Sequence, residues 1–467
     1  MLTLAEAARS LGLPPAAEVA IAGGSIDSRA VRPGDLFFAL PGERADGHDY
    51  VSAALAAGAA AAVIESRRRD RFAPAYQARL LAVESPLEAL QHLAAEARRK
   101  WGGTLIGITG SAGKTTTKEM IAAALEARYR VLKTEGNLNN HLGVPLTLLR
   151  LTRQHEMAVV EMGMNHAGEI ARLAAIARPN AGVVTNVAPV HLGHFTSLDA
   201  IAAAKRELIE ALPASGIAVL NANDERVARF GAGFAGRSVA YGLADAPRAW
   251  AGPLLISLDR LQLEGAAGSS FRARDGEGGE ARVRLALPGR HNAMNAGAAL
   301  ATARVFGVGL TAAAAALEGM NAGAGRGRVL QGAGITLLDD CYNANPAAVE
   351  TMLQVLAATP GKRHLAVLGE MLELGAGAPE WHRQAGRAAA AARLDALFAV
   401  QGEAREILAG ARAAGFQGEA EFFASAAECL PRLQAALRPG DVVLVKGSHG
   451  VRLETLVAAL LTLLNLK

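Results

Sequence analysis

The segment over residues 110–117 reads GSAGKTTT and constrains the fold of this chain more than any other feature. An apolar run over 105–108 precedes it and an apolar-periodic stretch over 118–125 follows it, which predicts the order strand, glycine-rich turn, helix. Glycines allow successive backbone N–H groups to converge on an anion at a helix N-terminus. The pattern therefore predicts a loop that binds nucleotide phosphates, formed by Gly110, Ser111, Ala112, Gly113, Lys114, Thr115 and Thr116.

Two side chains of this loop carry its chemistry. Lys114 is placed to reach the β- and γ-phosphates, and the hydroxyl of Thr115 is placed to reach Mg²⁺. The general phosphate-loop pattern has a glycine where this chain has Ile108. The loop is therefore a variant in which Thr109 and Gly110 open the turn.

The composition favours a multidomain globular protein with an anionic small-molecule ligand. A chain of 467 residues has room for about three domains of roughly 100–200 residues each. Hydrophobic residues make up 51% of the chain and charged residues 20%, as is typical of globular proteins. The net charge is +4, the basic residues are dispersed apart from 67–69, and aromatic residues make up only 4%. We therefore expect no nucleic-acid partner.

Cysteine usage and the N-terminal sequence favour a soluble, cytoplasmic protein. The only cysteines, Cys341 and Cys429, lie far apart without metal-type spacing, and a reducing compartment is the simplest interpretation. Residues 1–6 contain no basic region followed by an apolar stretch, and no uncharged apolar run reaches the roughly 18 residues of a membrane span. We expect neither a signal peptide nor membrane insertion.

The order of apolar segments predicts an α/β fold of three domains, over 1–101, 102–323 and 324–467. Strand and helix patterns alternate in the second and third ranges, which is typical of mostly parallel sheets covered by helices. Residues 240–288 contain several short β-like segments, and we expect an antiparallel insertion there. The third range is typical of a Rossmann-like domain with ligand contacts at the carboxyl ends of its strands. The glycine-rich segment 319–327 is the expected hinge.

Polar residues follow several of the predicted strands. Glu161 comes directly after the apolar run 158–160, where an acid is a natural Mg²⁺ ligand; the alternative is a helix cap or a surface glutamate. His191 follows the next strand, and Lys205 lies on the helix after it. Taken alone, each is consistent with an ordinary core or surface residue. Together with the phosphate loop, these residues predict ATP bound between two α/β domains, with Mg²⁺ at the interface.

Two further segments concentrate polar residues at element ends. Residues 339–346 read DDCYNANP and close the first strand of the third range with a proline before a helix, which suits a nucleotide or substrate contact. Residues 289–295 read GRHNAMN and open a helix, where the asparagines can be caps or can contact a base.

These motifs resemble those of the Mur ligases, the ATP-dependent enzymes that build the peptide of the bacterial cell-wall precursor. The family has the short phosphate loop TGSxGKTT, which accounts for Ile108. Its other motifs are present as Glu161, HLG from His191, GRHNxxN over 289–295, Gly325-Arg326, and KGS from Lys446. The resemblance extends over essentially the whole chain.

Further segments narrow the resemblance within the family. Residues 27–49 are similar to the uridine-binding N-terminal domain. Residues 137–145, 339–346 and 367–375 are similar to the member that adds D-alanyl-D-alanine to UDP-N-acetylmuramoyl-tripeptide. The relative that forms the tripeptide has a DYAHTP-like segment where this chain reads DCYNANP. The family prefers Ser or Thr at Cys341, and a small residue there changes little.

The resemblance implies that ATP phosphorylates the tripeptide carboxylate and that the dipeptide amine then attacks the acyl phosphate. It implies catalytic roles for Lys114, His191 and Lys205, with His191 at a second Mg²⁺ and Lys205 carbamylated by CO₂. The implied Mg²⁺ contacts are Thr115, Glu161 and His191, and the implied nucleotide contacts beyond the loop are Asn292, Asn295, Arg326 and Asp340. The implied substrate contacts are Ser28, Arg29, Asn137, Asn139, Asn140, Asn343, Asn345, Lys446 and Ser448. ATP and Mg²⁺ are the expected cofactors, and we expect a monomer.

Three alternatives stay open at this point. The tripeptide-forming Mur ligase uses a diamino acid or lysine in place of the dipeptide. Folylpolyglutamate synthetases share the phosphate loop and the third domain, but have no reason to carry the segment 27–29. A nucleotide-binding regulator with a degenerate ligase site is the third, although Lys114, Thr115, Glu161 and His191 are all intact.

Overall fold

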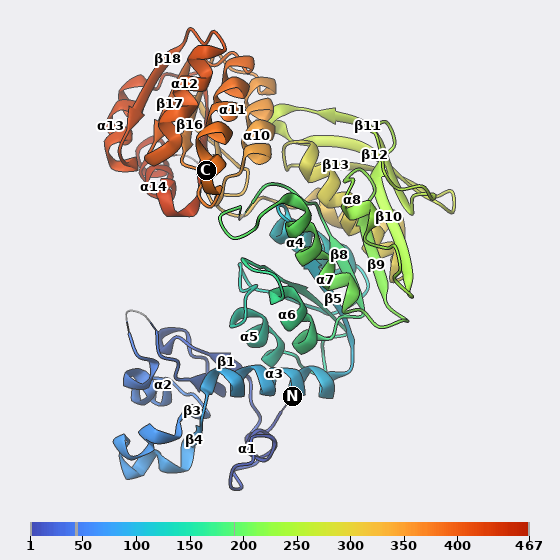
Figure 1. Ribbon diagram of the computed structural model, residues 1–467, viewed down its shortest axis with the longest axis vertical. Coiled ribbons are helices and arrows are strands. Elements are labelled where there is room, and N and C mark those ends of the chain that lie inside the picture. The colour runs from blue at the N-terminus through green and yellow to red at the C-terminus, as the bar shows by residue number, and fades with distance from the viewer. Residues whose placement is uncertain (1, 43–44, 191, 466–467) are drawn as a thin grey trace.

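The computed structural model describes residues 2–42, 45–190 and 192–465, and within these ranges the strands form three sheets of four, nine and six strands (Figure 1). The three sheets follow one another along the chain, each with its own helices, so the predicted α/β fold is confirmed. The strands of each sheet fall within one of the ranges 1–101, 102–323 and 324–467, which we keep as the proposed domain division and call the N-terminal, central and C-terminal units.

The N-terminal unit is a small parallel sheet in the order β1-β2-β3-β4. Its strands are β1 (Gly23–Ser25), β2 (Asp35–Phe38), β3 (Ala61–Glu65) and β4 (Leu80–Val83), and its helices are α1 (Leu4–Ser10), α2 (Val51–Ala56) and α3 (Pro86–Trp101). Helix α3 begins at an N-cap, where the Ser85 side chain accepts a hydrogen bond from Glu88 N, and ends at Gly102, whose φ of 68° is left-handed.

The N-terminal and central units share one apolar core. Leu90 and Leu93 of α3 lie in the same buried cluster as Val144 of α5 and Leu173 of α6. The buried guanidinium of Arg98 donates from Nε to Ala177 O at 2.7 Å, and so ties α3 to the end of α6. The two units are therefore packed against each other through continuous buried apolar contacts.

The central sheet has the strand order β13-β12-β11-β10-β9-β8-β5-β7-β6. Its strands are β5 (Thr104–Thr109), β6 (Val131–Lys133), β7 (Met157–Glu161), β8 (Ala181–Val184), β9 (Ile217–Asn221), β10 (Arg237–Leu243), β11 (Ile256–Leu263), β12 (Ser269–Asp275) and β13 (Glu280–Leu285). Its helices are α4 (Lys114–Glu126), α5 (Gly143–Leu149), α6 (Glu169–Ala177), α7 (Leu198–Glu210), α8 (Arg290–Val305) and α9 (Leu310–Glu318).

The strands β10 to β13 correct the expectation of an insertion over 240–288. β10 pairs in parallel with β9 and with β11, whereas the β11–β12 and β12–β13 pairs are antiparallel, so the expected antiparallel pairing is present but it is not confined to a separate insertion. The segment therefore extends the main sheet. Its apolar residues, such as Leu258 and Phe271, are buried in the core that also holds α8 and α9, so these strands could not stand apart from the sheet.

The C-terminal unit is a six-stranded sheet in the order β14-β15-β19-β16-β17-β18, parallel except for β14. Its strands are β14 (Arg328–Gly332), β15 (Ile335–Asp340), β16 (Arg363–Gly369), β17 (Ala396–Val400), β18 (Glu419–Phe423) and β19 (Asp441–Lys446). Its helices are α10 (Pro346–Ala358), α11 (Ala378–Ala391), α12 (Arg405–Ala413), α13 (Ala426–Ala436) and α14 (Leu453–Leu464). Helices α10 to α12 pack on one face of the sheet, and α13 and α14 pack on the other.

The C-terminal unit meets the central unit near the tip of β11 and β12 (Figure 1). Here Ala266 N donates to Thr359 Oγ1, just beyond α10, at 2.9 Å. Gly265 has a φ of 56°, and a Cβ there would lie 2.6 Å from Thr359 Cα, so only glycine permits this approach. In the described part of the chain, no helix is long and apolar enough to cross a membrane.

Candidate active site

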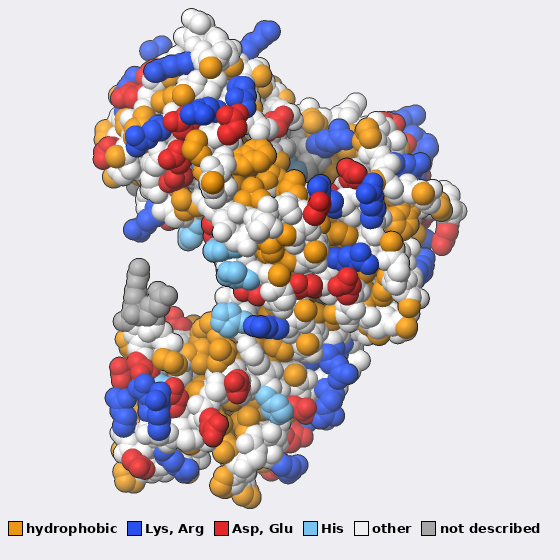
Figure 2. Space-filling view, in the orientation of Figure 1, with side chains coloured by type: hydrophobic (Ala, Val, Ile, Leu, Met, Phe, Trp, Pro, Cys, Tyr) orange, Lys and Arg blue, Asp and Glu red, His pale blue; other side chains and the backbone are white. Residues whose placement is uncertain are grey.

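A cleft of about 520 Å³ lies between the central and C-terminal units. The central unit contributes the phosphate loop, the loop around Asn137, the residues after β7 and the start of α8, while the C-terminal unit contributes the carboxyl ends of β15, β16 and β19. Figure 2 shows this side of the molecule hollowed between the C-terminal unit above and the N-terminal unit below, with histidine side chains along the hollow. Ligand sites at the carboxyl ends of parallel strands are the rule in α/β folds.

The phosphate loop has the backbone that its glycines predict. β5 ends at Thr109 and α4 begins at Lys114, so the loop delivers the N-terminus of α4 to the cleft. Gly110 and Gly113 have φ values of 153° and 79°. A Cβ at Gly110 would lie 1.8 Å from Thr185 Oγ1, and a Cβ at Gly113 would lie 2.6 Å from Asn295 Oδ1. Both positions therefore require glycine.

Residues that follow β8 hold the loop in place, and the sequence analysis missed them. Ala112 N donates to Asn186 Oδ1 and Ser111 N donates to Asn186 O, each at 2.9 Å. Thr185 Oγ1 donates to Ala112 O at 2.7 Å. Because β8 is hydrogen-bonded beside β5, polar residues at its end necessarily meet the loop, and the signal was two polar residues directly after an apolar strand.

Lys114 lies half-buried in the cleft, where Nζ donates to Gly110 O at 2.8 Å. Burial lowers the pKa of Lys114; the nearby Glu161 carboxylate raises it and the Arg326 guanidinium lowers it further. Lys114 is therefore close to the carboxylate of Glu161 in the central unit and to the guanidinium of Arg326 in the C-terminal unit. Thr115 and Thr116 line the same cleft.

Glu161, at the end of β7, contributes its side chain to the lining of the cleft. Its backbone N donates to Thr134 Oγ1 at 3.0 Å, and its Oε1 accepts from Asn139 Nδ2 at 2.8 Å. Its Oε2 is buried and has no hydrogen-bond partner among the residues that the structure describes. An orphaned carboxylate oxygen that shares a cleft with the Thr115 hydroxyl fits a hard divalent cation.

A magnesium ion here would need ligands from the nucleotide and water as well. Within the described ranges, no group of three His, Cys, Asp or Glu side chains could hold a metal ion. Mg²⁺ is usually bound by one or two carboxylates together with substrate phosphates and water. The residues present fit that mode.

His191 and Lys205 are the two other predicted catalytic residues. His191 lies outside the described residues. Lys205, on α7, is 2% exposed, and in the described part of the chain no group accepts a hydrogen bond from its Nζ. Burial holds the pKa of Lys205 well below its usual value, and the charge of Lys114 lowers it further. Both effects shift Lys205 toward its neutral form.

The ends of β15 and β19 place an ion pair in the cleft. Asp340 and Lys446 are register partners, and Lys446 Nζ donates to Asp340 Oδ2 and, at 3.1 Å, to Asn343 O. Burial raises the pKa of Asp340, whereas the Lys446 charge and hydrogen bond lower it. Ser448 is buried, and its Oγ accepts from Leu372 N at 2.9 Å.

Tyr342 connects the two units across the cleft, a contact that the sequence analysis did not find. The Arg326 guanidinium carbon lies 3.8 Å from the centroid of the Tyr342 ring, and the His449 ring stacks on the tyrosine with a centroid distance of 5.7 Å. Asn137 Nδ2 of the central unit donates to Tyr342 Oη at 2.5 Å. The only available signal was an aromatic residue within a polar strand end.

Several predicted asparagines make hydrogen bonds within the protein. Asn345 is the N-cap of α10, and its Oδ1 accepts from Ala348 N at 2.9 Å. Asn140 Oδ1 accepts from Gly143 N, also at 2.9 Å. Asn292 and Asn295 form a buried chain in which Thr117 Oγ1 donates to Asn295 Oδ1, Asn295 Nδ2 to Asn292 Oδ1, and Asn292 Nδ2 to Pro288 O. This series of hydrogen bonds fixes α8 against α4.

Most predicted site residues are brought together. The predicted residues that line the cleft are Ser111, Ala112, Gly113, Lys114, Thr115, Thr116, Asn137, Asn139, Glu161, Asn292, Asn295, Arg326, Asp340, Asn343, Asn345, Lys446 and Ser448. Of the described residues that we predicted, Gly110, Asn140, Lys205, Ser28 and Arg29 are outside this lining.

Ser28 and Arg29 belong to the N-terminal unit, in the 3₁₀ turn η1 (Ser28–Ala30). The Arg29 side chain is 88% exposed and pairs with Asp27 at 2.7 Å. The hydrogen bonds from Arg29 lower the pKa of Asp27 to about 2. An exposed guanidinium in a charge-paired turn can meet a ligand only at the surface of this unit.

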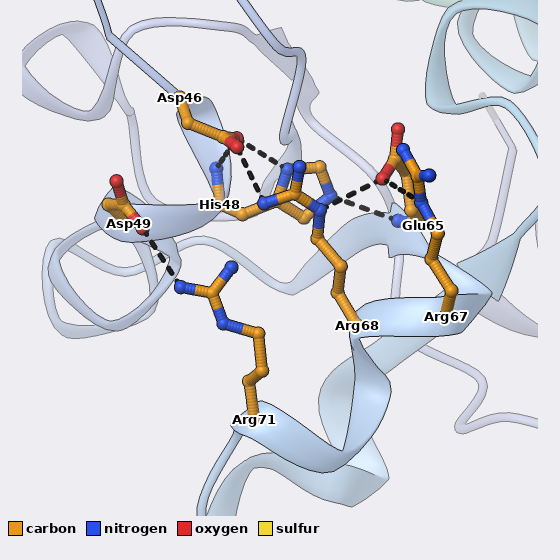
Figure 3. A network of polar contacts seen from close by, with 7 residues as sticks. All are labelled: Asp46, His48, Asp49, Glu65, Arg67, Arg68 and Arg71. Atoms are coloured by element: carbon orange, nitrogen blue, oxygen red, sulfur yellow. Dashed lines mark hydrogen bonds and ion pairs between the residues drawn. The ribbon is translucent and has the colours of Figure 1, made fainter.

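A buried histidine organises a polar network in the N-terminal unit (Figure 3). His48 Nδ1 contacts Asp46 Oδ1 at 2.7 Å, and His48 Nε2 accepts from Glu65 N at 3.0 Å. Arg68 pairs with Asp46 at 2.6 Å and with Glu65 at 2.9 Å. Burial opposes ionisation of Asp46, but hydrogen bonds from His48 and the charge of Arg68 bring its pKa to about 2. The network fixes the segment 46–50 to the end of β3.

Family models match three parts of the chain. The model "Mur ligase family, catalytic domain" matches residues 20–98, "Mur ligase middle domain" matches residues 108–303, and "Mur ligase, glutamate ligase domain" matches residues 325–449. Together they span all three units.

Relatives of similar length share between one third and two fifths of their residues with this chain. The UDP-N-acetylmuramoyl-tripeptide–D-alanyl-D-alanine ligase of Synechocystis sp. is 39% identical over 443 residues, covering 93% of this chain and 91% of the relative. The Escherichia coli ligase of the same name is 38% identical over 447 residues, covering 95% and 94%.

Solved structures with the same arrangement include two of MurF. The structure of MurF from Acinetobacter baumannii matches with a TM-score of 0.85 and 32% identity over 98% of each chain. The MurF ligase from Thermotoga maritima, solved in complex with ADP, matches with a TM-score of 0.78 and 30% identity over 93% of this chain and 96% of the other.

Proposed function

We infer that this chain, which belongs to the Mur ligase family, is the ATP-using ligase that joins D-alanyl-D-alanine to UDP-N-acetylmuramoyl-tripeptide in the synthesis of peptidoglycan precursor. The observation that carries its chemistry is one cleft holding Lys114 and the partnerless oxygen of Glu161 from the central unit and the Asp340–Lys446 pair from the C-terminal unit.

We propose an acyl-phosphate route for the reaction. A carboxylate is a poor acyl donor, so its oxygen first attacks the γ-phosphorus of ATP and ADP leaves. The neutral amine of the dipeptide then attacks the carbonyl carbon, the amide forms, and phosphate leaves with the carboxylate oxygen. Negative charge accumulates around the transferring phosphoryl group, so preorganised cations and backbone donors are the main catalytic groups.

We propose the following roles for the residues, which their positions in the cleft support. Lys114 and the N-terminus of α4 bind the β- and γ-phosphates. Thr115 and Glu161 would hold Mg²⁺, which when bound would neutralise charge on the phosphates. The buried Asn292–Asn295 chain supports the phosphate loop through Thr117 and Gly113. Arg326 and Asp340 approach the nucleotide from the C-terminal unit, with His449 and Tyr342 behind Arg326.

The substrate contacts extend beyond the cleft. Ser28 and Arg29 contact the uridine end of the substrate on the N-terminal unit, while Asn137, Asn139, Asn343, Lys446 and Ser448 contact the reacting peptide ends. Because the N-terminal and central units share a core, we propose that the C-terminal unit moves alone on the segment 319–327 when the cleft closes and excludes water from the acyl phosphate. We place the reaction in the cytoplasm and propose a monomeric enzyme.

We predict that Lys205 carries a carbamate. A neutral amine can attack CO₂ and release a proton, and burial favours the neutral form of Lys205. With ¹³C-labelled CO₂, the wild type should give a carbamate resonance by NMR that the Lys205→Arg variant lacks, and CO₂-depleted buffer should slow the wild type several-fold. A resonance equal in both proteins, or none in either, would contradict the modification.

Omission of single substrates tests the function. Phosphate release from Mg-ATP should require both UDP-N-acetylmuramoyl-tripeptide and D-alanyl-D-alanine, and mass spectrometry should find the pentapeptide product. Release that instead requires the dipeptide precursor and a diamino acid would indicate the tripeptide-forming ligase, and release with a folate and glutamate would indicate a folylpolyglutamate synthetase. Nucleotide binding without release under any of these conditions would indicate a regulator.

A further inference from the structure

The loop over residues 370–375, between β16 and α11, lines the active-site cleft through Leu372, Glu373 and Leu374. It contains only a turn at 372–373 before the short 3₁₀ turn η7 (Gly375–Gly377), and side chains from neighbouring elements also contact its backbone.

Side chains from two elements hold consecutive backbone N–H groups of this loop. Met371 N donates to His382 Nε2 of α11 at 2.9 Å. Leu372 N donates to Ser448 Oγ, which follows β19, at 2.9 Å, and Ser448 N donates back to Glu370 O at 3.1 Å. The first half of the loop is therefore fixed to the C-terminal unit.

The hydrogen bonds of His382 determine its protonation. The ring is fully buried, and Nδ1 lies 2.7 Å from Ala378 O. Because a carbonyl accepts and a peptide N–H donates, the proton is on Nδ1 and Nε2 is an unprotonated acceptor. Burial lowers the pKa of His382, which favours this neutral form, although the charges of Glu370, Glu403 and Glu406 oppose the shift.

The second half of the loop contacts the central unit. Glu373 O accepts from Gly193 N at 3.1 Å, in the connection between β8 and α7. A Cβ at Gly375 would lie 3.0 Å from Leu192 O, so the 370–375 loop and the β8–α7 connection are in close contact there. Glu373 has a φ of 65°, a left-handed conformation that a side-chain-bearing residue keeps only where its surroundings enforce it.

We propose that His382 is a positioning residue for the ligase reaction. By accepting from Met371 N, it fixes the loop so that Glu373 O meets Gly193 N and joins the C-terminal unit to the β8–α7 connection. That connection includes Asn186, which holds the phosphate loop, and leads to the helix that carries Lys205. The inference rests on the proposed function, because it assigns the contact to the assembly of that active site.

The test separates turnover from nucleotide binding. His382→Leu should lower kcat about tenfold, because small displacements of reacting groups are costly, and leave KM for ATP within about twofold. His382→Gln, whose Oε1 can accept from Met371 N, should recover most of the lost kcat. A His382→Leu enzyme with the wild-type kcat, a His382→Gln enzyme as slow as His382→Leu, or a change confined to KM for ATP would overturn the proposal.

A second pair of variants tests the other end of the loop if His382→Leu does not fold. Gly375→Ala and Gly415→Ala both place a Cβ at positive φ, 63° and 83°, but the alanine at 375 meets Leu192 O and the alanine at 415 has nothing within 4 Å. Similar losses of Tm are expected for both, with kcat reduced several-fold only in Gly375→Ala. Equal kcat values would overturn the proposal. If the wild type itself shows no dipeptide-dependent phosphate release, the proposed function fails instead.

Discussion

Replacing Lys114 with methionine is expected to slow dipeptide-dependent phosphate release about a thousandfold. Methionine retains much of the apolar stem and removes the charge at the start of α4, where the γ-phosphate is transferred. In the cleft that charge lies near the Glu161 carboxylate of the central unit and the Arg326 guanidinium of the C-terminal unit. The measurement is the initial rate of phosphate release at saturating Mg-ATP, tripeptide and dipeptide.

Lys133→Met is the matched control for this variant. Lys133 is on β6 of the same unit, its side chain is 39% exposed, and it pairs with Glu119 outside the cleft. Its loss should leave the rate unchanged. A Lys114→Met enzyme within about tenfold of the wild type, a difference worth only about 1.4 kcal/mol in the barrier, would show that Lys114 does not bind the transferring phosphate.

Replacing Glu161 with glutamine should reduce the rate about a hundredfold and raise the Mg²⁺ concentration required for half-maximal activity. The amide oxygen can still accept from Asn139 Nδ2, so the local structure is kept. At the position of the partnerless Oε2, however, the variant has an NH₂ group, which cannot bind a cation. The measurement is phosphate release over a range of Mg²⁺ concentrations.

The stability of this variant provides an independent check. Glu161 is a buried carboxylate, and among the described residues one of its oxygens has no hydrogen-bond partner, so removing its charge should leave Tm in the absence of Mg²⁺ equal to or above that of the wild type. Glu156→Gln, at an exposed position before β7, is the control and should leave activity unchanged. An unaltered Mg²⁺ dependence in Glu161→Gln would remove Glu161 from the metal site.

The parts of the site that the sequence predicted are those encoded locally. The phosphate loop depends on glycines within eight residues, and its strand, turn and helix are all adjacent in the chain. Glu161 was predicted to bind Mg²⁺ because it directly follows an apolar run. That contact stays a prediction, supported by an oxygen that has no hydrogen-bond partner among the described residues. Neither inference required knowledge of which strands lie side by side.

The parts that the sequence did not predict depend on contacts between distant segments. Thr185 and Asn186 hold the phosphate loop only because β8 pairs with β5, and Tyr342 meets Asn137 only because the C-terminal unit lies over the cleft. Strand order and domain placement are tertiary properties that no local pattern contains. The extension of the central sheet by β10 and β11 was mistaken for an insertion for the same reason.

Asparagines show how a single residue type supports two interpretations. Asn345 precedes Pro346, which is the usual sequence of an N-cap followed by the first residue of a helix, and the structure has this cap. The substrate contacts that we predicted at Asn345 and Asn140 stay predictions, since a side chain that caps a helix retains only part of its hydrogen-bonding capacity for a ligand.

The most direct measurement follows isotopic oxygen from the tripeptide to phosphate. UDP-N-acetylmuramoyl-tripeptide labelled with ¹⁸O in both oxygens of its terminal carboxylate is incubated with the enzyme, Mg-ATP and D-alanyl-D-alanine, and both products are analysed by mass spectrometry. The account predicts one pentapeptide for each phosphate released, with one ¹⁸O in the phosphate and the other in the new amide. Unlabelled phosphate, or phosphate released without pentapeptide, would contradict an acyl-phosphate ligase.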